Sequence, residues 1–299
     1  MKLAGTFPIK SIEMRERGIR ISMKTEYENY YETSKVYDNN RAPVGIEIIL
    51  GCFASTPRLL TEQNILDAGC GTGSYVYALE DKLGHLCGLE LNEGMLARAR
   101  NKCGNHANIQ LDQGTLLDPL PYMDETFDGV MCNQVLHHLV AVSDQAKFTS
   151  VNQLIEEAWR VLRPRGALIL NTSSHRQLYD GFWWADLIPD AVDRIAERFP
   201  SIESLVSILT EAGFQKTSVF VPMDAVMQSR NYLDPMGPLK KEFRDGDSTW
   251  SLATGEELER AQARIRSMNQ EGTMESYLEM REDLRKKTGQ ITFISSYKQ

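Results

Sequence analysis

Several features that mark other classes of protein are missing from this sequence of 299 residues. It has no apolar run of about 18 residues, so we expect no transmembrane helix. Its five cysteines stand singly, without a C-x-x-C pair, which indicates reduced thiols of a cytoplasmic protein and no metal site. The net charge is −8, so phosphate backbones and anionic membranes would be repelled. We therefore expect neither nucleic acid nor membrane as a partner, and the sequence carries no sign of an oligomeric state.

The most informative stretch that is present is residues 65–73, Ile-Leu-Asp-Ala-Gly-Cys-Gly-Thr-Gly. A short apolar strand leads into Asp67. The glycines then stand at alternate positions, Gly69, Gly71 and Gly73. Glycine lets the backbone turn tightly and approach a bulky ligand where any Cβ would clash. Because residues 74–79 are typical of a helix whose N-terminus points at that ligand, the pattern predicts a loop that binds a nucleotide-type cofactor.

A second carboxylate follows this loop at the distance expected of a ribose ligand. Residues 86–90 are typical of a strand and end in Glu90, about 20 residues downstream, where dinucleotide-type folds hold the ribose hydroxyls. The glycine spacing distinguishes between cofactors. Nicotinamide-binding loops follow G-x-G-x-x-G, whereas the third glycine here comes one residue early.

Four further segments carry a family resemblance together with the D-x-G-x-G-x-G form of residues 67–73. They are residues 92–99, 121–130, 135–139 and 160–166. In this order they make residues 63–221 resemble the class I S-adenosylmethionine-dependent methyltransferases, and the core is similar to the small-molecule and quinone-biosynthesis members of that family. The resemblance implies a methyltransferase whose cofactor is S-adenosyl-L-methionine.

The resemblance also implies a Rossmann-like α/β fold. This fold has a seven-stranded, mostly parallel sheet with helices on both faces and an antiparallel last strand. Short apolar runs predict strands at residues 64–67, 86–90, 109–112, 127–132 and 167–171, and the resemblance adds 217–221 and 291–296. Helices are expected at residues 44–54, 94–102 and 151–161.

We divide the chain into four parts. They are an N-terminal arm and cofactor lid (1–41), a cofactor-binding core (42–221), an insertion (222–290) and the last core strand (291–299). In the insertion, residues 254–257 have the form of a capping box, and Leu258, Ala261, Ile265 and Met268 recur at helical spacing. Because the insertion adjoins the last two strands, we interpret it as a substrate cap. An oligomerisation or packing element is the alternative.

The resemblance assigns cofactor contacts to the ends of the first four strands. Glu90 would accept hydrogen bonds from the ribose hydroxyls, and Thr115 stands where the family usually has the acid that receives the adenine amine. The full set is Asp67, Gly69, Cys70, Gly71, Gly73, Glu90, Leu91, Met95, Gly114, Thr115, Leu116, Asn133 and Arg41. Arg41 would meet the carboxylate of the cofactor. A second departure from the family is Arg165, at a turn position where glycine is usual.

The methyl acceptor is expected beyond the fourth and fifth strands. The candidates for catalysis are His137, as a general base, and Tyr37, although a histidine here more often has a structural role. Residues 133–136, Asn-Gln-Val-Leu, replace the D/N-P-P-aromatic segment of nucleobase methyltransferases, which argues against a nucleobase acceptor. The candidates for acceptor binding are His138, Tyr179, Phe182, Trp183 and Trp184. The aromatic ones could instead pack in the core.

These observations predict an S-adenosylmethionine-dependent methyltransferase that transfers a methyl group to a small molecule by in-line displacement. Such a reaction depends mainly on aligning two molecules, because the cofactor already carries a good leaving group. Two alternatives stay open. One is a catalytically silent, cofactor-binding regulatory protein, and the other is a protein or RNA methyltransferase with an open acceptor surface.

Overall fold

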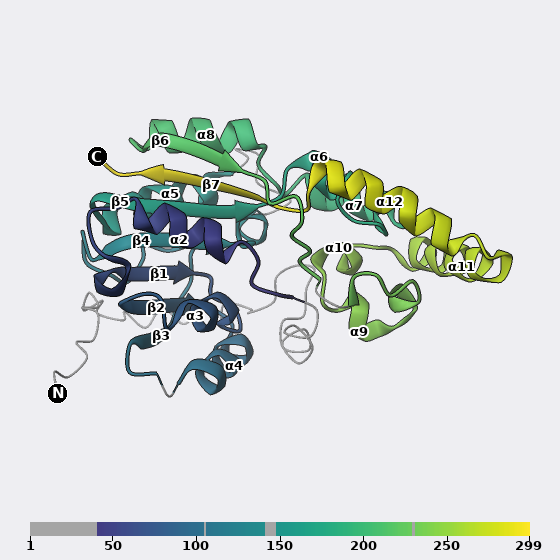
Figure 1. Ribbon diagram of the computed structural model, residues 1–299, viewed down its shortest axis with the longest axis horizontal. Helices are drawn as coiled ribbons and strands as arrows, with labels where there is room; N and C mark the ends of the chain where they lie inside the picture. The colour runs from purple at the N-terminus through teal and green to yellow at the C-terminus, as the bar shows by residue number, and fades with distance from the viewer. Residues whose placement is uncertain (1–40, 105, 141–147, 229–230) are drawn as a thin grey trace, which may run out of the picture.

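The computed structural model describes residues 41–104, 106–140, 148–228 and 231–299, and its centre is a seven-stranded sheet (Figure 1). The strands are β1 (Asn64–Ala68), β2 (His85–Glu90), β3 (Ile109–Gln113), β4 (Phe127–Asn133), β5 (Leu162–Thr172), β6 (Gln215–Phe220) and β7 (Thr292–Tyr297). Their order in the sheet is β3-β2-β1-β4-β5-β7-β6, and only β7 runs antiparallel to its neighbours. This confirms the expected fold class.

The central strands β1, β2 and β4 are almost entirely buried because helices cover both faces of the sheet. The flanking helices are α2 (Ile46–Ala54), α3 (Ser74–Leu79), α4 (Glu93–Cys103), α5 (Thr149–Val161) and α8 (Ile202–Glu211). Consecutive residues of β1 point to opposite faces: Ile65 packs in the cluster that includes α2 and α3, and Leu66 in the cluster that includes α5 and α8. Two short 3-10 turns, η1 (Leu60–Glu62) and η2 (Leu136–His138), complete the connections.

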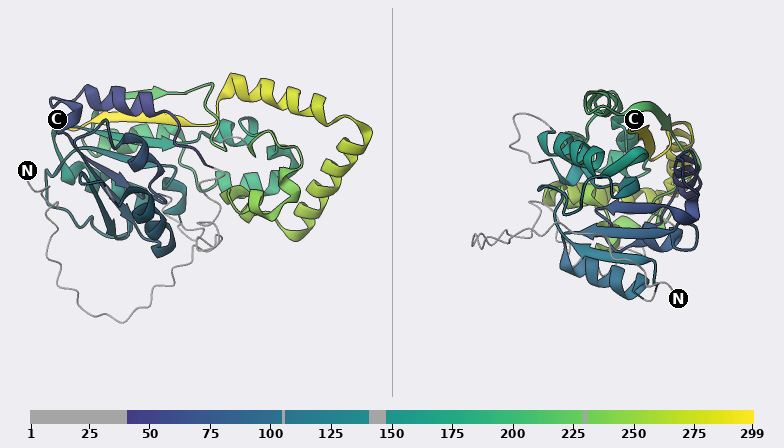
Figure 2. Two further views of the ribbon diagram at one scale, coloured as in Figure 1. Left: turned by 60° about the horizontal axis from the view of Figure 1, so that its bottom comes forward. Right: turned by 90° about the vertical axis from the view of Figure 1, so that its left-hand side faces the viewer.

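An accessory group of helices lies beyond the carboxyl ends of the parallel strands (Figures 1 and 2). It contains η5 (Gly237–Leu239), α9 (Lys241–Arg244), α10 (Ser248–Ser251), α11 (Gly255–Glu271) and α12 (Met274–Thr288) from the insertion. Three elements that follow β5 join them, namely α6 (His175–Asp180), η3 (Ala185–Leu187) and α7 (Pro189–Ala196). Helix α12 lies against α6, α10 against α7, and α11 against η3. The accessory group is therefore larger than the predicted insertion.

The predicted capping box at the start of α11 is only half formed. Thr254 caps the helix as expected, since its hydroxyl accepts a hydrogen bond from the Glu257 N–H at 3.2 Å. The Glu257 carboxylate does not return to Thr254. It accepts instead from the Ala191 N–H at 3.0 Å and from the Arg194 guanidinium at 2.7 Å. The reciprocal bond predicted from the motif is thus wrong, because Glu257 is buried against α7 and fixes α11 to it.

Arg165 occupies a turn whose backbone favours glycine. Its φ is 67°, in the left-handed region that a side chain with a Cβ disfavours. The turn is kept because the Arg165 N–H donates to the carbonyl of Lys298 at 3.0 Å, just beyond β7. The departure from the family noted in the sequence therefore concerns backbone geometry and not chemistry.

Within the described parts of the chain, no helix is both long and apolar enough to cross a membrane. In the same residues, no three histidine, cysteine or acidic side chains gather in a way that could hold a metal ion. All five cysteines are buried thiols.

Candidate active site

The glycine loop between β1 and α3 is built from three residues with positive φ, namely 84° at Gly69, 54° at Gly71 and 76° at Gly73. A Cβ on Gly69 would lie 2.7 Å from a methyl group of Val135, and one on Gly73 would lie 3.1 Å from the Cβ of Ala99. A Cβ on Gly71 would meet no atom within 4 Å. The first and third glycines are thus required by packing, whereas the middle one borders open space that a ligand could fill.

Asp67 at the end of β1 is a buried carboxyl with one unpaired oxygen. One oxygen accepts a hydrogen bond from the Asn133 amide at 3.2 Å, and the other has no partner. Burial raises the pKa of Asp67 to about 7, the bond from Asn133 opposes this rise, and the nearby charge of Glu90 adds to it. A buried oxygen without a donor beside a glycine loop is suited to a ligand that brings its own N–H or O–H groups.

Glu90 at the end of β2 faces the same loop. Its carboxylate accepts from the Gly71 N–H at 2.9 Å and from the Asn92 N–H at 2.7 Å. Burial raises the pKa of Glu90, while hydrogen bonds from three backbone N–H groups act against that rise. An ionised carboxylate has about four lone-pair positions. The two oxygens of Glu90 therefore keep capacity for further donors, such as ribose hydroxyls.

The other predicted cofactor residues lie around these carboxyls, because the ends of β2 and β3 are adjacent and Glu90 pairs with Gln113. Leu91 is 40% exposed, whereas Met95 and Leu116 are buried. The Thr115 hydroxyl accepts from the Leu117 N–H at 3.1 Å, and the Gly114 N–H donates to the carbonyl of Glu90 at 3.1 Å. Burial holds the pKa of the Cys70 thiol well above its usual range, so Cys70 contributes an uncharged side chain to the loop.

His137 and His138 form the 3-10 turn after β4 and are in ring contact at 3.9 Å. His137 also stacks on Phe199, with the ring centres 4.4 Å apart. Burial lowers the pKa of both imidazoles, and the positive charges of Arg41 and Arg198 lower them further; the pKa of His138 falls to about 3. Both rings are therefore neutral at neutral pH, able to accept a hydrogen bond but weak as bases. The other catalytic candidate, Tyr37, lies outside the described residues.

Arg41 is held by the insertion. Its guanidinium pairs with Asp247 at 3.0 Å and donates to the carbonyl of Gly246 at 3.2 Å. The contact predicted for Arg41 with the cofactor carboxylate stays a prediction, and any such contact would have to share the guanidinium with Asp247. Sequence reasoning missed Asp247, since an acid in a polar segment between two short helices has no distinguishing pattern.

The predicted aromatic residues after β5 are mostly interior. Trp183 and Trp184 are at most 1% exposed, and Phe182 is 4% exposed. The Trp183 indole N–H donates to the carbonyl of Tyr232, and that of Trp184 donates to the side-chain oxygen of Gln228 at 3.0 Å. Only Tyr179 has a largely open ring. These side chains join the core to the insertion, and direct contact with an acceptor stays a prediction for them.

One residue that the sequence reasoning did not assign, Asn171, completes the polar groups at this edge. Asn171, near the end of β5, lies opposite Asn133 in the sheet and contacts both its side chain and Gln134. A polar residue ending an apolar strand, as in Ala-Leu-Ile-Leu-Asn, was the available signal. The same rule that singled out Asp67 and Glu90 would have found it.

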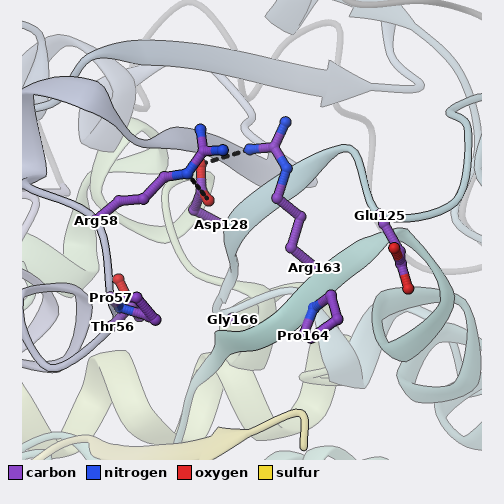
Figure 3. Close-up of a pocket in the computed structure, with 8 residues that line it drawn as sticks. All are labelled: Thr56, Pro57, Arg58, Glu125, Asp128, Arg163, Pro164 and Gly166. Carbon is purple, nitrogen blue, oxygen red and sulfur yellow. Dashed lines mark hydrogen bonds and ion pairs between the residues drawn. The ribbon is translucent and has the colours of Figure 1, made fainter.

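A pocket at the opposite, amino end of β1 and β4 has a structural explanation (Figure 3). Asp128 lies in it between Arg58 and Arg163, at 3.3 Å and 2.7 Å, and also accepts from the Asn64 N–H at 2.9 Å. These bonds tie the beginnings of three neighbouring strands together. The pocket lies at the far end of the strands from the glycine loop.

Comparison with known proteins agrees with this geometry. Residues 66–170 match the family model described as a methyltransferase domain. A demethylmenaquinone methyltransferase of Shouchella clausii (strain KSM-K16) is 30% identical over 178 residues, which cover 52% of this chain and 71% of that protein. The biotin biosynthesis bifunctional protein BioHC of Teredinibacter turnerae is 31% identical over 169 residues, which cover 51% of this chain but 26% of that protein.

Solved structures share the fold. A protein of Anabaena variabilis described as a methyltransferase from an antibiotic biosynthesis pathway matches with a TM-score of 0.63 and 21% identity, covering 84% of this chain and 96% of that one. A Haemonchus contortus phosphoethanolamine N-methyltransferase, solved with S-adenosyl-L-methionine, matches with a TM-score of 0.51 and 17% identity, covering 90% of this chain and 56% of that one. The fold and site thus define a Rossmann-like methyltransferase. The chain belongs to the class I S-adenosylmethionine-dependent methyltransferases; it is an enzyme and S-adenosyl-L-methionine is its cofactor.

Proposed function

We propose that the methyl acceptor is a small molecule bound between the carboxyl ends of β4 and β5 and the accessory helices. The observation that carries this proposal is the position of those helices, which lie beyond the carboxyl ends of the parallel strands, the same end of the sheet as the glycine loop (Figure 2). In open α/β sheets, ligands bind in the crevice outside the carboxyl ends of the strands. A site enclosed between these helices and the strand ends would suit a compact acceptor better than the surface of a protein or an RNA.

The names of two relatives point the same way. One is named for demethylmenaquinone and the other for biotin biosynthesis, and both names refer to small molecules. We extend the insertion, as a functional unit, to include α6, η3 and α7, because these helices pack against it. Substrate selection is thus proposed to reside in residues 175–199 and 222–290 together, and cofactor binding in the core.

The residues at the glycine loop fit S-adenosyl-L-methionine. The open space beside Gly71 would admit the cofactor, the unpaired oxygen of Asp67 would accept from its ammonium group, and Glu90 would accept from its ribose hydroxyls. The remaining contacts proposed are those of Gly69, Cys70, Gly73, Leu91, Met95, Gly114, Thr115, Leu116 and Asn133. Together these groups present carboxyl oxygens to the polar parts of the cofactor and apolar side chains to its adenine.

The cofactor supplies an activated methyl group on a sulfonium, so the chain mainly has to align the acceptor with it and exclude water. His137 is the proposed proton acceptor for an acceptor atom that loses a proton. Because burial lowers its pKa, His137 would be neutral and ready to accept before the reaction but could hold the proton only weakly. The main contribution to rate is therefore expected from orientation.

The experiment is an incubation of the full chain with methyl-labelled S-adenosyl-L-methionine and a metabolite extract, followed by mass spectrometry of small molecules, protein and RNA. A folded Gly71→Val variant is the matched control for background methylation. A labelled metabolite that requires the native chain supports the proposal. Label in protein or RNA instead, or cofactor binding without any labelled product, contradicts it and favours one of the two alternatives.

A further inference from the structure

Asn171 lies at the junction of three elements beneath the glycine loop. It is 1% exposed and sits beside Asn133 in the parallel pair of β4 and β5. Its amide nitrogen donates to the Tyr75 hydroxyl at 3.0 Å and, more weakly, to the side-chain oxygen of Asn133 at 3.4 Å. Its side-chain oxygen accepts from the Gln134 amide at 3.0 Å, and its carbonyl accepts from the Gln134 N–H at 2.8 Å. Every polar atom of the side chain is thus engaged.

The side-chain hydrogen bonds from Gln134 to Asp67 all have their donors on the Gln134 side and their acceptors on the Asp67 side. Gln134 donates to Asn171, Asn171 donates to Asn133, and Asn133 donates to Asp67 at 3.2 Å. An asparagine amide can rotate by half a turn, and its neighbours decide which end points where. With the Asn171 amide nitrogen facing it, Asn133 presents its oxygen to β5 and its nitrogen to Asp67. The reverse orientation would place an amide oxygen against the carboxylate.

The backbone supports the same arrangement. Gln134 has a φ of 53°, an uncommon conformation for a residue other than glycine. Strained positions of this kind persist where the surrounding structure determines them, and they cluster at functional sites. Two bonds to Asn171 hold Gln134 here. On the other side, the Tyr75 hydroxyl that accepts from Asn171 donates to the carbonyl of Val44 at 3.1 Å.

We propose that Asn171 is a positioning residue for the cofactor: by fixing the Asn133 amide, it directs one donor to Asp67 and leaves the second Asp67 oxygen for the methionine end of S-adenosyl-L-methionine. This inference rests on the proposed role of Asp67 in cofactor binding and is independent of the identity of the acceptor. Asn171 itself need not touch the cofactor.

Four titratable groups on the neighbouring elements interact with Asp67. Glu90 and Cys87 face it from β2, Cys132 from β4 and Cys70 from the loop. Burial raises the pKa of all three thiols, so they stay neutral near pH 7, and Glu90 is the neighbour whose charge raises the pKa of Asp67. Because the pKa of Asp67 is about 7, binding of a cationic ammonium group should favour its ionised form, and affinity should rise with pH until Asp67 is ionised.

The test uses S-adenosylhomocysteine, which keeps the ammonium group, and calorimetry of the full chain from pH 5.5 to 9. Asn171→Asp is nearly isosteric but places an oxygen and a negative charge where the donor was. We expect its affinity to fall at least tenfold at pH 7.5, with the pH midpoint moved upward by about one unit, since a second nearby carboxylate disfavours ionisation of Asp67. The matched control is Asn108→Asp, which removes an amide that donates to the carbonyls of Glu80 and Leu83 away from the site.

Two further variants keep the inference falsifiable if Asn171→Asp does not fold. Tyr75→Phe removes one acceptor of Asn171 and should shift affinity and midpoint in the same direction by a smaller amount. Asp67→Asn should abolish the midpoint near neutrality. Wild-type affinity in a folded Asn171→Asp protein, or a loss of affinity without a moved midpoint, would overturn the positioning role while leaving the glycine loop intact. A midpoint that survives in Asp67→Asn would overturn the role of Asp67 and this inference with it.

Discussion

The guanidinium of Arg41 donates to the carboxylate of Asp247 at 3.0 Å across 206 residues of sequence. Asp247 is 4% exposed, also accepts from the Gln228 amide at 3.3 Å, and caps α10 through the Thr249 N–H. Next to this pair, the Ala42 N–H donates to the carbonyl of Met227 at 3.0 Å. The segment that enters α2 is therefore fixed to the insertion by both side chain and backbone.

Asp247→Ala should destabilise the protein by about 3 kcal/mol, because it leaves Arg41 without its carboxylate in a mostly buried place and removes the cap of α10. Urea unfolding measures the change. Asp180→Ala is the control, since the Arg176–Asp180 pair it breaks is largely exposed on the arginine side. That pair is expected to contribute well under 1 kcal/mol. Equal losses in the two variants would show that Asp247 has no special structural weight.

Gly71→Val should remove binding of S-adenosylhomocysteine, because a branched side chain would fill the open space beside the loop. Gly272→Val is a matched control. Gly272 has a φ of 72° and also has no neighbour within 4 Å of its Cβ position, but it ends α11, away from the loop. Both variants should lose about 1–2 kcal/mol of stability through backbone strain. Calorimetry should show binding lost in Gly71→Val alone; retained binding there would disprove the loop assignment.

Glu90→Ala should weaken S-adenosylhomocysteine binding at least tenfold, in line with the roughly 1.5–3 kcal/mol of hydrogen bonds to a charged group. Loss of the bonds to Gly71 and Asn92 could contribute to this effect. An analogue that lacks the ribose 2′-hydroxyl separates the two causes. If Glu90 accepts from the ribose, the analogue should bind the wild-type protein more weakly than S-adenosylhomocysteine does. The Glu90→Ala substitution should then lower the affinity for the analogue by a smaller factor than the affinity for S-adenosylhomocysteine. An identical loss for both ligands would place the ribose elsewhere.

Asp67→Asn should stabilise the ligand-free protein above neutral pH. The folded protein holds the Asp67 proton up to a pKa of about 7, against 3.8 for the ordinary group, so its stability falls as the pH rises through this window. The amide variant avoids this loss, which by the pKa difference is at most on the order of 4 kcal/mol at pH 8 and absent at pH 4. Thermal melts at both pH values measure it. Asp128→Asn is the contrast, because it breaks two arginine pairs and should lower stability at pH 8.

Arg165→Gly should raise the free energy of unfolding by up to about 1 kcal/mol. The left-handed conformation costs a residue with a Cβ roughly 1–2 kcal/mol of folded-state stability, which glycine avoids. The greater conformational freedom of glycine in the unfolded chain offsets part of this stabilisation. The N–H that donates to Lys298 is retained. Arg176→Gly, in the first turn of α6, is the opposite control and should destabilise by a similar amount. A destabilised Arg165→Gly protein would show that its side chain matters more than its backbone.

The core could be predicted from sequence because its signals are local. Residues 64–67 and 86–90 are short apolar runs that each end in an acidic residue, with the glycine loop between them. The observed strands lie within a residue or two of these predicted bounds. The glycine loop followed for the same reason, since positive φ at three alternate positions strongly favours three alternate glycines. The last two strands, and the antiparallel direction of the last one, came with the family resemblance and not from periodicity.

The polar groups at the site were less predictable because their partners are distant in sequence. Asn171 meets Asn133 after 38 residues and Tyr75 after 96, so its place at the end of an apolar strand marks it as polar at the sheet edge but does not reveal these partners. Trp183 and Trp184 also have partners that are distant in sequence. Their residue type suggested either an acceptor pocket or core packing, and their hydrogen-bond partners Tyr232 and Gln228 come from the insertion, whose folding no pattern near residue 183 reveals.

The position of β7 between β5 and β6 affects how the molecule is made on the ribosome. Strand β7 lies between β5 and β6 in the sheet but follows the accessory helices in the chain. The pairing of β5 with β7 and of β7 with β6 therefore has to wait until those helices have been synthesised. Pairings between distant segments form late and leave strand edges exposed meanwhile. We therefore expect the nascent chain to need protection at the β5 edge until β7 emerges, and slow translation through α11 and α12 to prolong the aggregation-prone interval.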